Sequence, residues 1–211
     1  MTRTARIHDP QVRAVVLGSS QPPSVVDAGR AGARGLTVLR RRSGGGAVLV
    51  EPGDPVWVDV WVPRHDPLWR EDVVAAAEWV GEWWAGTLGA LGVPDVAVHR
   101  GAPVRTRWSS TVCFAGLAPG EVTVAGTKVV GVAQWRGKEG ALFHSAAHVH
   151  WAPERLIDVL ALDDEERAVA SRDLATAAVG LEAVGGPGVA GRLSAELVAR
   201  LAGPPWSVRR G

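Results

Sequence analysis

Three features of this sequence have residue types that could do chemistry, and the first is a glycine loop. The loop Ser43-Gly44-Gly45-Gly46 follows the basic run Arg40-Arg41-Arg42. Three glycines without side chains let backbone N–H groups approach a ligand, such as a carboxylate, a phosphate or an acyl carbonyl. Arg41 or Arg42 could pair with an anion there. A glycine triplet alone is equally typical of a flexible hairpin turn, and this one lacks the Gly-Lys-Ser/Thr of a P-loop.

The second feature is Lys128, which begins an apolar stretch that includes Gly131. A lysine in such a stretch usually points to solvent, because burial without a partner costs free energy. If it points into a polar site instead, its ammonium could bind a carbonyl oxygen or a developing oxyanion. Gly131 would then allow the backbone to approach a ligand closely.

The third feature is Cys113, the only cysteine in the sequence. A solitary cysteine is by default an inert buried side chain, and it becomes a nucleophile only where a cation or base favours the thiolate. Lys128 and the histidines are candidates for that role. His144, His148 and His150 would share one face of a regular strand. Strand neighbours two apart converge poorly on one ion, so we expect no metal site and favour one histidine as a base or ligand contact.

Hydrophobic periodicity indicates which elements position these residues. Strands are expected at 14–17, 36–39, 47–50, 56–62, 96–98, 121–125, 128–134 and 141–149, and helices at 25–33, 70–91, 153–160, 163–178 and 194–201. The segment 56–62 alternates valine with Trp57, Asp59 and Trp61, which predicts a strand with two different faces. Strands dominate before residue 150 and helices after it, so the pattern predicts an α+β fold.

The overall composition limits the classes of protein to which the chain can belong. Its 211 residues are 46% hydrophobic, which suits one domain with one sizeable core. We expect a loose N-terminal arm at 1–13, most clearly over residues 1–10, a main body at 14–160 and a helical extension of the same domain at 161–211. A net charge of +1 argues against general nucleic-acid binding. We detect no signal peptide or membrane span, and a cytoplasmic protein is the simplest expectation.

Two motifs taken together resemble the signatures of the lipoate–protein ligase A family. The segment Arg41-Arg42-Ser43-Gly44-Gly45-Gly46-Ala47-Val48 resembles Arg-Arg-x-Ser-Gly-Gly-Gly-Ala-Val. The segment Gly126-Thr127-Lys128-Val129-Val130-Gly131-Val132-Ala133-Gln134 resembles Gly-x-Lys-(apolar)-x-Gly-(small)-Ala. Their order along the chain also agrees, and the resemblance covers roughly residues 14 to 160. Two motifs in order are far more specific than either one.

The resemblance implies the catalytic fold shared with biotin–protein ligases and octanoyltransferases, a mixed and largely antiparallel sheet flanked by helices. It implies that lipoate or octanoate lies beside the glycine loop and that Lys128 holds the acyl carbonyl. The implied acyl- or adenylate-binding residues are Arg42, Ser43, Gly44, Gly45, Gly46, Ala47, Gly131, Ala133 and His144. The implied acceptor is a lysine on a lipoyl domain of a 2-oxoacid dehydrogenase, or on the H-type protein of the glycine cleavage system.

A finer resemblance bears on the mechanism. Cys113-Phe114 followed by Lys128 resembles the Cys-Phe…Glu…Gly-x-Lys arrangement of the octanoyltransferase branch, in which the cysteine is the nucleophile. In that branch the acyl group passes from octanoyl-acyl carrier protein to cysteine and then to the acceptor lysine, without ATP. We therefore expect Cys113 and Lys128 to be the catalytic residues, and we expect no tightly bound cofactor.

Departures from the family pattern leave two alternatives open. Ser43-Gly44-Gly45-Gly46 is the version typical of ligases, whereas octanoyltransferases usually have Thr-Gly-Gly-Arg. The first alternative is therefore an ATP- and Mg²⁺-dependent ligase that uses free lipoate. The accessory C-terminal domain of full-length ligases is expected to be absent, which favours a transferase. Ser145-Ala146 stands where relatives often have His-Gly, and it keeps a second alternative open, a non-catalytic acyl- or adenylate-binding relative.

Overall fold

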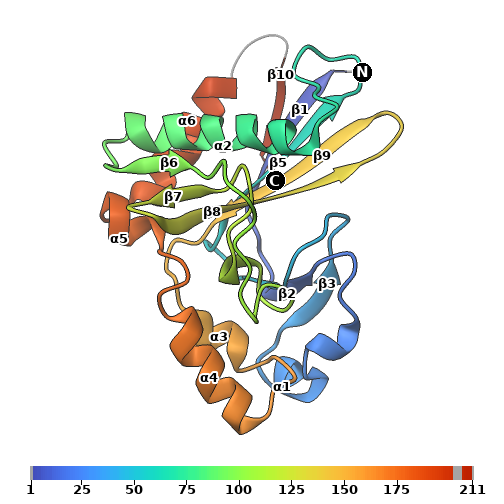
Figure 1. Ribbon diagram of the computed structural model, residues 1–211, viewed down its shortest axis with the longest axis vertical. Helices are drawn as coiled ribbons and strands as arrows, with labels where there is room; N and C mark the ends of the chain where they lie inside the picture. Colours follow the sequence, from blue (N-terminus) through green and yellow to red (C-terminus); the bar gives the residue numbers. More distant parts are fainter. Residues whose placement is uncertain (1, 202–205, 211) are drawn as a thin grey trace.

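The structure is a computed structural model that describes residues 2–201 and 206–210 and contains two sheets with their covering helices (Figure 1). The larger sheet contains β1 (Arg3–His8), β5 (Val56–Pro63), β6 (Val96–Val98), β7 (Val122–Val124), β8 (Thr127–Arg136), β9 (Gly140–Ala147) and β10 (Trp206–Arg210). The smaller sheet contains β2 (Ala14–Leu17), β3 (Thr37–Arg40) and β4 (Val48–Val50). The helices are α1 (Ala28–Ala33), α2 (Val73–Ala90), α3 (Pro153–Ile157), α4 (Asp164–Leu174), α5 (Leu181–Gly185) and α6 (Val189–Leu201), with 3₁₀ turns η1 (Pro23–Val25) and η2 (Cys113–Ala115).

Most neighbouring strands of the two sheets are antiparallel. The larger sheet has the order β10-β1-β5-β9-β8-β7-β6, in which only the β1–β10 pair is parallel. The smaller sheet has the order β3-β2-β4, with β2 parallel to β3 and antiparallel to β4. The predicted α+β fold with a mixed, largely antiparallel sheet and flanking helices is confirmed.

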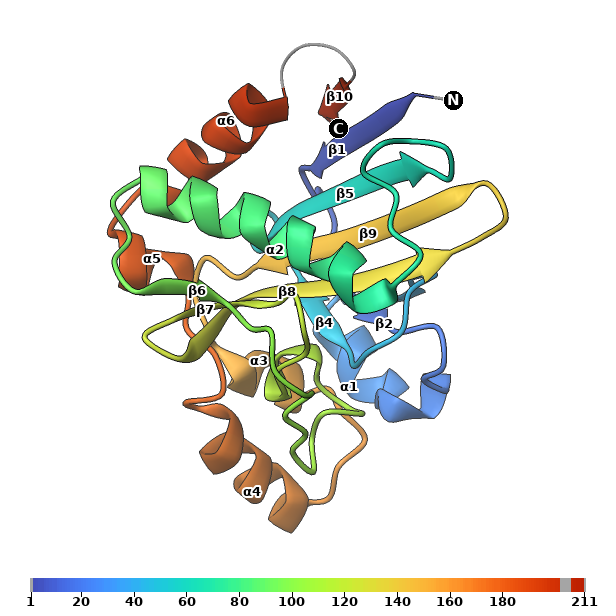
Figure 2. The same cartoon turned by 45° about the horizontal axis from the view of Figure 1, so that its top comes forward.

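Strand β5 has the two faces that its alternation predicts. Its four valines belong to the main core, which the sheet forms with α2 and α6. Figure 2 shows α2 lying across this face of the sheet. Trp57 belongs instead to a small cluster with Val48, Val50 and Ala146, which lies between the two sheets. The polar side chain of Asp59 points to the same side as Trp57, so β5 contributes to both the core and the space between the sheets.

Helix α2 is the best-predicted element. Asp72 caps it by accepting hydrogen bonds from the N–H groups of the next turn, so the helix begins at Val73 and not at residue 70. Val80, Trp84 and Leu88 are fully buried, as the spacing predicts. Val73 is 52% exposed because it occupies the first turn, beyond the edge of the core.

A second core lies around the smaller sheet, on the side covered by α1, α3 and α4 (Figure 1). Helix α4 begins with a capping box in which Asp163 and Glu166 each accept the other's backbone N–H. The helix expected at 25–33 is divided into η1 and α1, and Asp27 caps α1. In the described residues, no helix is long and apolar enough to cross a membrane.

The expected loose arm over residues 1–10 is wrong. Arg3–His8 forms β1, whose Ala5 and Ile7 are buried in the main core while polar residues alternate with them. Its polar composition concealed that alternation, and pairing with β5 and β10 satisfies its backbone. The sequence analysis also did not predict β10 or α5. These short elements are defined by the neighbours on which they pack more than by their own sequence.

Candidate active site

A cleft of about 610 Å³ brings the two sequence motifs together. The glycine loop residues Gly44, Gly45 and Gly46 form one wall, and β8 forms another through Lys128 and Ala133. Cys113 lies between them on the segment that connects β6 to β7. Residues separated by about 80 positions in the sequence therefore meet at one cavity, as the resemblance implies.

Arg41 fixes the conformation of the glycine loop from behind. Its side chain is only 8% exposed, and its Nη2 donates to the carbonyl oxygens of Gly44 and Gly46 at 2.7 and 2.8 Å. Its Nη1 and Nε donate to the carbonyl of Val16 and the hydroxyl of Ser43. The loop is therefore held in one conformation, unlike the flexible turn that a glycine triplet also permits.

Two of the three loop glycines have no room for a side chain. Gly45 has φ +94°, and a Cβ there would lie 2.9 Å from Arg41 Nη2. A Cβ on Gly46 would lie 2.5 Å from the carbonyl carbon of Val112. Within the described residues, no acceptor takes the amide N–H of Gly44, Gly45 or Gly46. These amides are therefore available to a ligand in the cleft.

Cys113 begins the 3₁₀ turn η2 beside the glycine loop. Its N–H donates to the Ala47 carbonyl at 3.0 Å, and the Ala47 N–H donates to the Thr111 carbonyl at 2.8 Å, so the two segments are joined by a short bridge. The thiol is partly buried, and Sγ lies 3.9 Å from Arg41 Nη2. The single thiol of the chain is thus placed at the cleft, next to a buried guanidinium.

Lys128 is buried and fully paired. Its Nζ lies 2.6 Å from Glu121 Oε2, and it donates to the backbone carbonyls of Cys113 and Gly116 at 3.0 Å each. Glu121 also accepts the N–H groups of Ala118 and Val132. A register shift between β7 and β8 follows Lys128, and such an irregularity re-aims a strand side chain.

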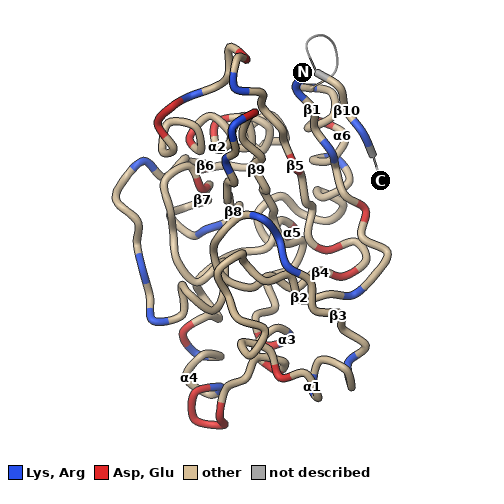
Figure 3. Tube along the Cα trace, turned by 90° about the vertical axis from the view of Figure 1, so that its right-hand side faces the viewer, with Lys and Arg blue, Asp and Glu red and all other residues tan. Residues whose placement is uncertain are grey.

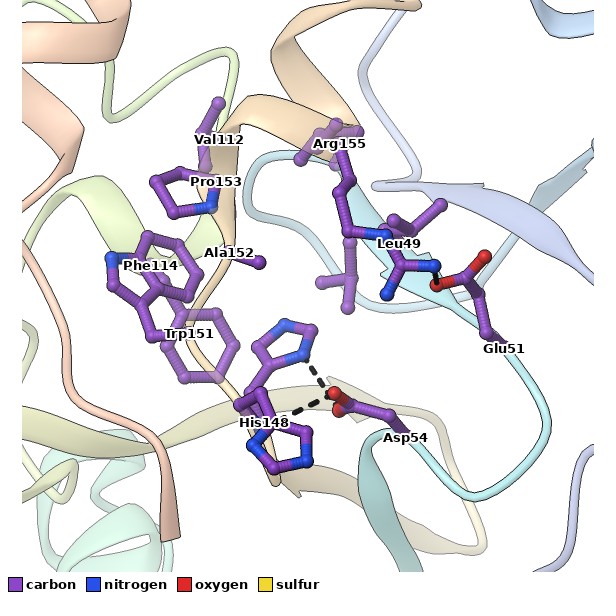
Figure 4. Close-up of a pocket in the computed structure, with 14 residues that line it drawn as sticks. Leu49, Glu51, Asp54, Val112, Phe114, His148, Trp151, Ala152, Pro153 and Arg155 are labelled. Carbon is purple, nitrogen blue, oxygen red and sulfur yellow. Dashed lines mark hydrogen bonds and ion pairs between the residues drawn. The ribbon is translucent and has the colours of Figure 1, made fainter. Parts of the chain in front are cut away.

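Phe114, the second residue of the Cys113 turn, is held by two other rings (Figure 4). Phe114 packs against His148 and Trp151, with ring centroids 4.9 and 5.6 Å away. His148 Nδ1 is hydrogen-bonded to Asp54, which also accepts the N–H groups of Val149 and His150. Burial opposes ionisation of Asp54, but these hydrogen bonds and the charge of His148 hold its pKa below the ordinary value. The pocket in Figure 4 has a volume of only about 30 Å³, so it supports the turn and is too small for an acyl chain.

A second, mostly apolar cavity of about 240 Å³ lies between the two sheets, and Asp59 and His144 form its polar wall. Asp59 accepts hydrogen bonds from His144, His8 and Trp57. Burial acts to raise the pKa of Asp59, but the hydrogen bonds from His144 and His8 and their charges hold it well below its usual range. His144 Nε2 is buried without a partner in the described residues.

The structure does not bring all the predicted site residues to the cleft. Arg42 stacks on Trp135 at 5.2 Å, and Gly131 lies against Phe114. Ser43, the first residue of the loop, is buried and does not line the cleft. His144 lines the second cavity, although its partner Ala133 on β8 lines the cleft, so the two cavities are neighbours on one face of the sheet.

The three histidines do not share a strand face as the spacing suggested, because β9 ends at Ala147. His144 binds Asp59, His148 binds Asp54, and His150 is exposed near Glu182. In the described residues, no group of His, Cys, Asp and Glu side chains is arranged to hold a metal ion.

Two residues that contribute to this geometry, Glu121 and Asp59, were given no role from the sequence, and a third, Arg41, was not distinguished from its neighbour. Glu121 is the glutamate of the Cys-Phe…Glu…Gly-x-Lys arrangement, and its place beside a motif lysine was the available signal. Asp59 was visible as the one charged residue on an alternating apolar strand. Arg41 and Arg42 were equivalent by sequence, and only the fold distinguishes the buried arginine from the stacked one.

Comparisons with known proteins identify relatives of the chain. The chain is 28% identical over 153 residues to the octanoyltransferase LipM of an Exiguobacterium strain. That match covers 71% of this chain and 55% of LipM, so the chain spans about half the length of this relative.

Solved structures of low sequence identity show the same fold. The bi-partite lipoate protein ligase of Thermoplasma acidophilum, described with its E2 lipoyl domain, has a TM-score of 0.75 at 19% identity, over 99% of this chain and 74% of that chain. A lipoate–protein ligase A bound with ATP has a TM-score of 0.70 at 20% identity, over 99% and 75%. The predicted lipoate ligase-like fold is confirmed.

Residues 4–188 match the model of the lipoyl protein ligase A/B catalytic domain, which spans both motifs, the cleft and most of the two sheets. Members of this family and the relatives named above are enzymes that attach lipoyl or octanoyl groups, as the resemblance implied. The chain belongs to the lipoyl protein ligase A/B catalytic-domain family.

Proposed function

We propose that the protein transfers an octanoyl or lipoyl group to a lysine of a lipoyl carrier domain, through a thioester on Cys113. The observation that carries this proposal is the position of the Cys113 thiol, which lies on the wall of the cleft beside the glycine loop. The similarity to LipM supports a transferase over the other activities of the family. The partner domains would be those of a 2-oxoacid dehydrogenase or the glycine cleavage H-type protein.

The transfer has two balanced steps. The Cys113 thiolate attacks the carbonyl carbon of an acyl thioester, and the donor's sulfur leaves and takes up a proton. The amine of the acceptor lysine then attacks the new thioester carbonyl, which forms the amide and releases the Cys113 thiolate, while the amine proton passes to solvent. Neither step needs ATP, and octanoyl-acyl carrier protein is the donor that suits the first step.

Backbone donors and Lys128 would stabilise the oxyanion in each step. The glycine loop, whose amides have no acceptor among the described residues, lines the cleft that holds Cys113. The three donors of the Lys128 ammonium are occupied by Glu121 and the carbonyls of Cys113 and Gly116, so an acyl oxygen must displace one of these two carbonyls to reach Nζ. We propose this exchange as the way in which Lys128 serves as carbonyl ligand.

The acyl chain would extend from Cys113 toward the apolar cavity between the sheets. Cys113 and Val16 pack on the cluster of Val48, Val50, Trp57 and Ala146, and Val16, Val50 and Trp57 also line that cavity. A saturated chain that covers this surface removes apolar area from water, which favours binding by about 0.8 kcal/mol per buried CH₂.

The test is mass spectrometry of a lipoyl domain after incubation with each donor, with and without ATP and Mg²⁺. We expect octanoyl-acyl carrier protein without ATP to modify the domain and to leave an octanoyl group on the protein. In the Cys113→Ala variant both products should be lost. Modification of the domain by this variant at the wild-type rate would exclude the thioester route.

One observation favours a second candidate, an ATP-dependent lipoate–protein ligase. The glycine loop has the ligase-type sequence, and its three free amides suit the phosphate of an acyl-adenylate. Domain modification from free lipoate only when ATP and Mg²⁺ are present, unaffected by Cys113→Ala, would establish this candidate. Tight acyl binding without modification from any donor would indicate the non-catalytic alternative.

A further inference from the structure

Two cations lie close to the Cys113 thiol, and they differ in whether an anion neutralises them. Arg41 Nη2 is 3.9 Å from Sγ, and Lys128 Nζ contacts the backbone carbonyl of the same cysteine. The proposed function needs a thiolate, which a nearby positive charge favours. The sequence analysis offered Lys128 for this role.

The positive charge of Lys128 is already neutralised. Glu121 Oε2 lies 2.6 Å from Nζ, and the two side chains are 3% and 5% exposed, so the pair is shielded from solvent. An ammonium has three N–H donors, and Glu121 with the two backbone carbonyls accepts all three. Beyond this neutral pair little net field remains to stabilise a thiolate.

The positive charge of Arg41 has no counter-ion. Its donors go to the carbonyls of Val16, Gly44 and Gly46 and to the hydroxyl of Ser43, all of which are uncharged. Among the described residues no carboxylate forms an ion pair with it, although its side chain is 8% exposed. A buried cation of this kind favours an anion nearby, and Sγ is the group in contact that can become one.

The central glycine of the loop keeps this contact open. A Cβ on Gly45 would lie 2.9 Å from Arg41 Nη2, so the guanidinium would have to move, while Cys113 Sγ at 3.7 Å would be in ordinary contact with it. Nη2 already donates both hydrogens to carbonyls, so its effect on Sγ is chiefly electrostatic. An electrostatic effect requires the guanidinium to lie close to the thiol, and the absence of a side chain on Gly45 leaves room for that contact.

We propose that Arg41 is the residue that activates Cys113, by holding an unneutralised positive charge against the thiol, and that the Lys128–Glu121 pair does not. The role of Arg41 in acyl transfer rests on the proposed function. Its effect on the reactivity of the Cys113 thiol does not. The charged or titratable groups around the Cys113 turn come from several segments. They are Arg41 before the glycine loop, Lys128 on β8, Glu121 just before β7, Arg105 on the wall of the cleft and His148 against Phe114.

The test is the rate at which iodoacetamide alkylates Cys113, followed by intact mass as a function of pH. In Arg41→Gln we expect this profile to move to higher pH and alkylation near neutral pH to slow about tenfold. In Arg41→Lys, which keeps the charge, the midpoint should move less. The matched control is the double variant Lys128→Gln/Glu121→Gln, which removes the neutral pair and should shift the midpoint by less than half of the Arg41→Gln shift.

A second measurement needs no variant at the loop. In the wild-type protein, negatively charged iodoacetate should react faster relative to iodoacetamide than it does with free cysteine, and Arg105→Gln should preserve most of this preference. An Arg41→Gln profile that coincides with the wild type, a larger shift in the double variant, or a wild-type preference no greater than that of free cysteine would each overturn the inference. Failure of every donor to acylate Cys113 while the alkylation results hold would refute only the proposed function.

Discussion

The three consecutive arginines form the longest basic stretch of the trace in Figure 3, yet the fold gives each one a different environment. Arg40 is exposed and donates to the Ser19 carbonyl. Arg41 is buried beneath the loop, and Arg42 stacks on Trp135. Identical side chains therefore have separate roles because strand β3 ends at Arg40 and the chain turns there.

Gly45→Ala tests the contact between Arg41 and the thiol. The change places a methyl group 2.9 Å from Arg41 Nη2 at a position with φ +94°, so we expect alkylation of Cys113 to slow at least severalfold. Gly53→Ala is the matched control, since Gly53 has φ +79° but no atom within 4 Å of its added Cβ. It carries the same backbone strain without the crowding, so its alkylation rate should match the wild type. Equal slowing in both variants would show that strain, and not contact, is responsible.

At this scale the sequence identified the reactive residue types but not their partners. The motifs predicted that Cys113, Lys128 and the glycine loop meet at one cavity, and the structure brings them there. The Glu121–Lys128 pair and the separation of Arg41 from Arg42 depend on side-chain directions set by a strand irregularity and a tight turn. Residue spacing alone does not predict the strand irregularity or the tight turn.

Strand β9 shows how an element can tolerate a departure from the family pattern. Ser145 faces away from the cleft, where its hydroxyl donates to the Val58 carbonyl and accepts the Trp84 indole N–H of α2. Ala146 faces the opposite side, in the cluster between the sheets. The serine therefore connects the sheet to its covering helix, which weakens the argument that this departure abolishes activity.

Ser145→Ala is expected to destabilise the protein without altering the thiol. The fully buried Trp84 N–H would lose its acceptor, at a cost of about 1–3 kcal/mol in the free energy of unfolding. Chemical denaturation measures that loss, and the alkylation rate of Cys113 should stay within twofold of the wild type. The double variant Ser145→Ala/Trp84→Phe, which removes both partners, should recover part of the stability. A marked change in alkylation would place Ser145 closer to the site than its contacts indicate.

In the whole molecule, two partly buried carboxylates join segments that are distant in sequence. Asp59 on β5 links β1 and β9 through His8 and His144. Asp54, in the turn before β5, holds the segment 148–150 that follows β9. The pKa of each carboxyl is lowered in the fold. When the pH falls below the ordinary aspartate pKa, the unfolded chain therefore binds more protons than the folded one.

The stability that these carboxylates contribute is complete above the ordinary aspartate pKa of 3.8 and is lost as the pH falls toward the lower folded values. We expect Asp59→Asn to reduce the free energy of unfolding near pH 7 by about 1–3 kcal/mol, with a smaller difference from the wild type below pH 4. Denaturation at a series of pH values measures this. Glu165→Gln, on the exposed first turn of α4, is the control and should leave the pH dependence unchanged. A difference that stays constant with pH would argue against an ionised Asp59.

The fold class could be predicted from the sequence because strong periodic segments such as α2 and β5 carry their own signal. The two strands that complete the sheet, β1 and β10, could not be predicted. Their residues form a strand only because β5 provides a partner for β1, and β1 then provides one for β10. Pairing between the ends of a chain is a long-range property that no local window contains.

The half-buried Cys113 is the only sulfhydryl of this chain, and this has a consequence for oxidation. A thiolate next to a cation is the form that peroxide converts to sulfenic acid. Many reactive cysteines recover through a second, resolving cysteine, and this chain provides none. Restoration of the thiol must therefore come from an external reductant, so the guanidinium that we propose to activate the thiol would also make the protein dependent on the redox state of its surroundings.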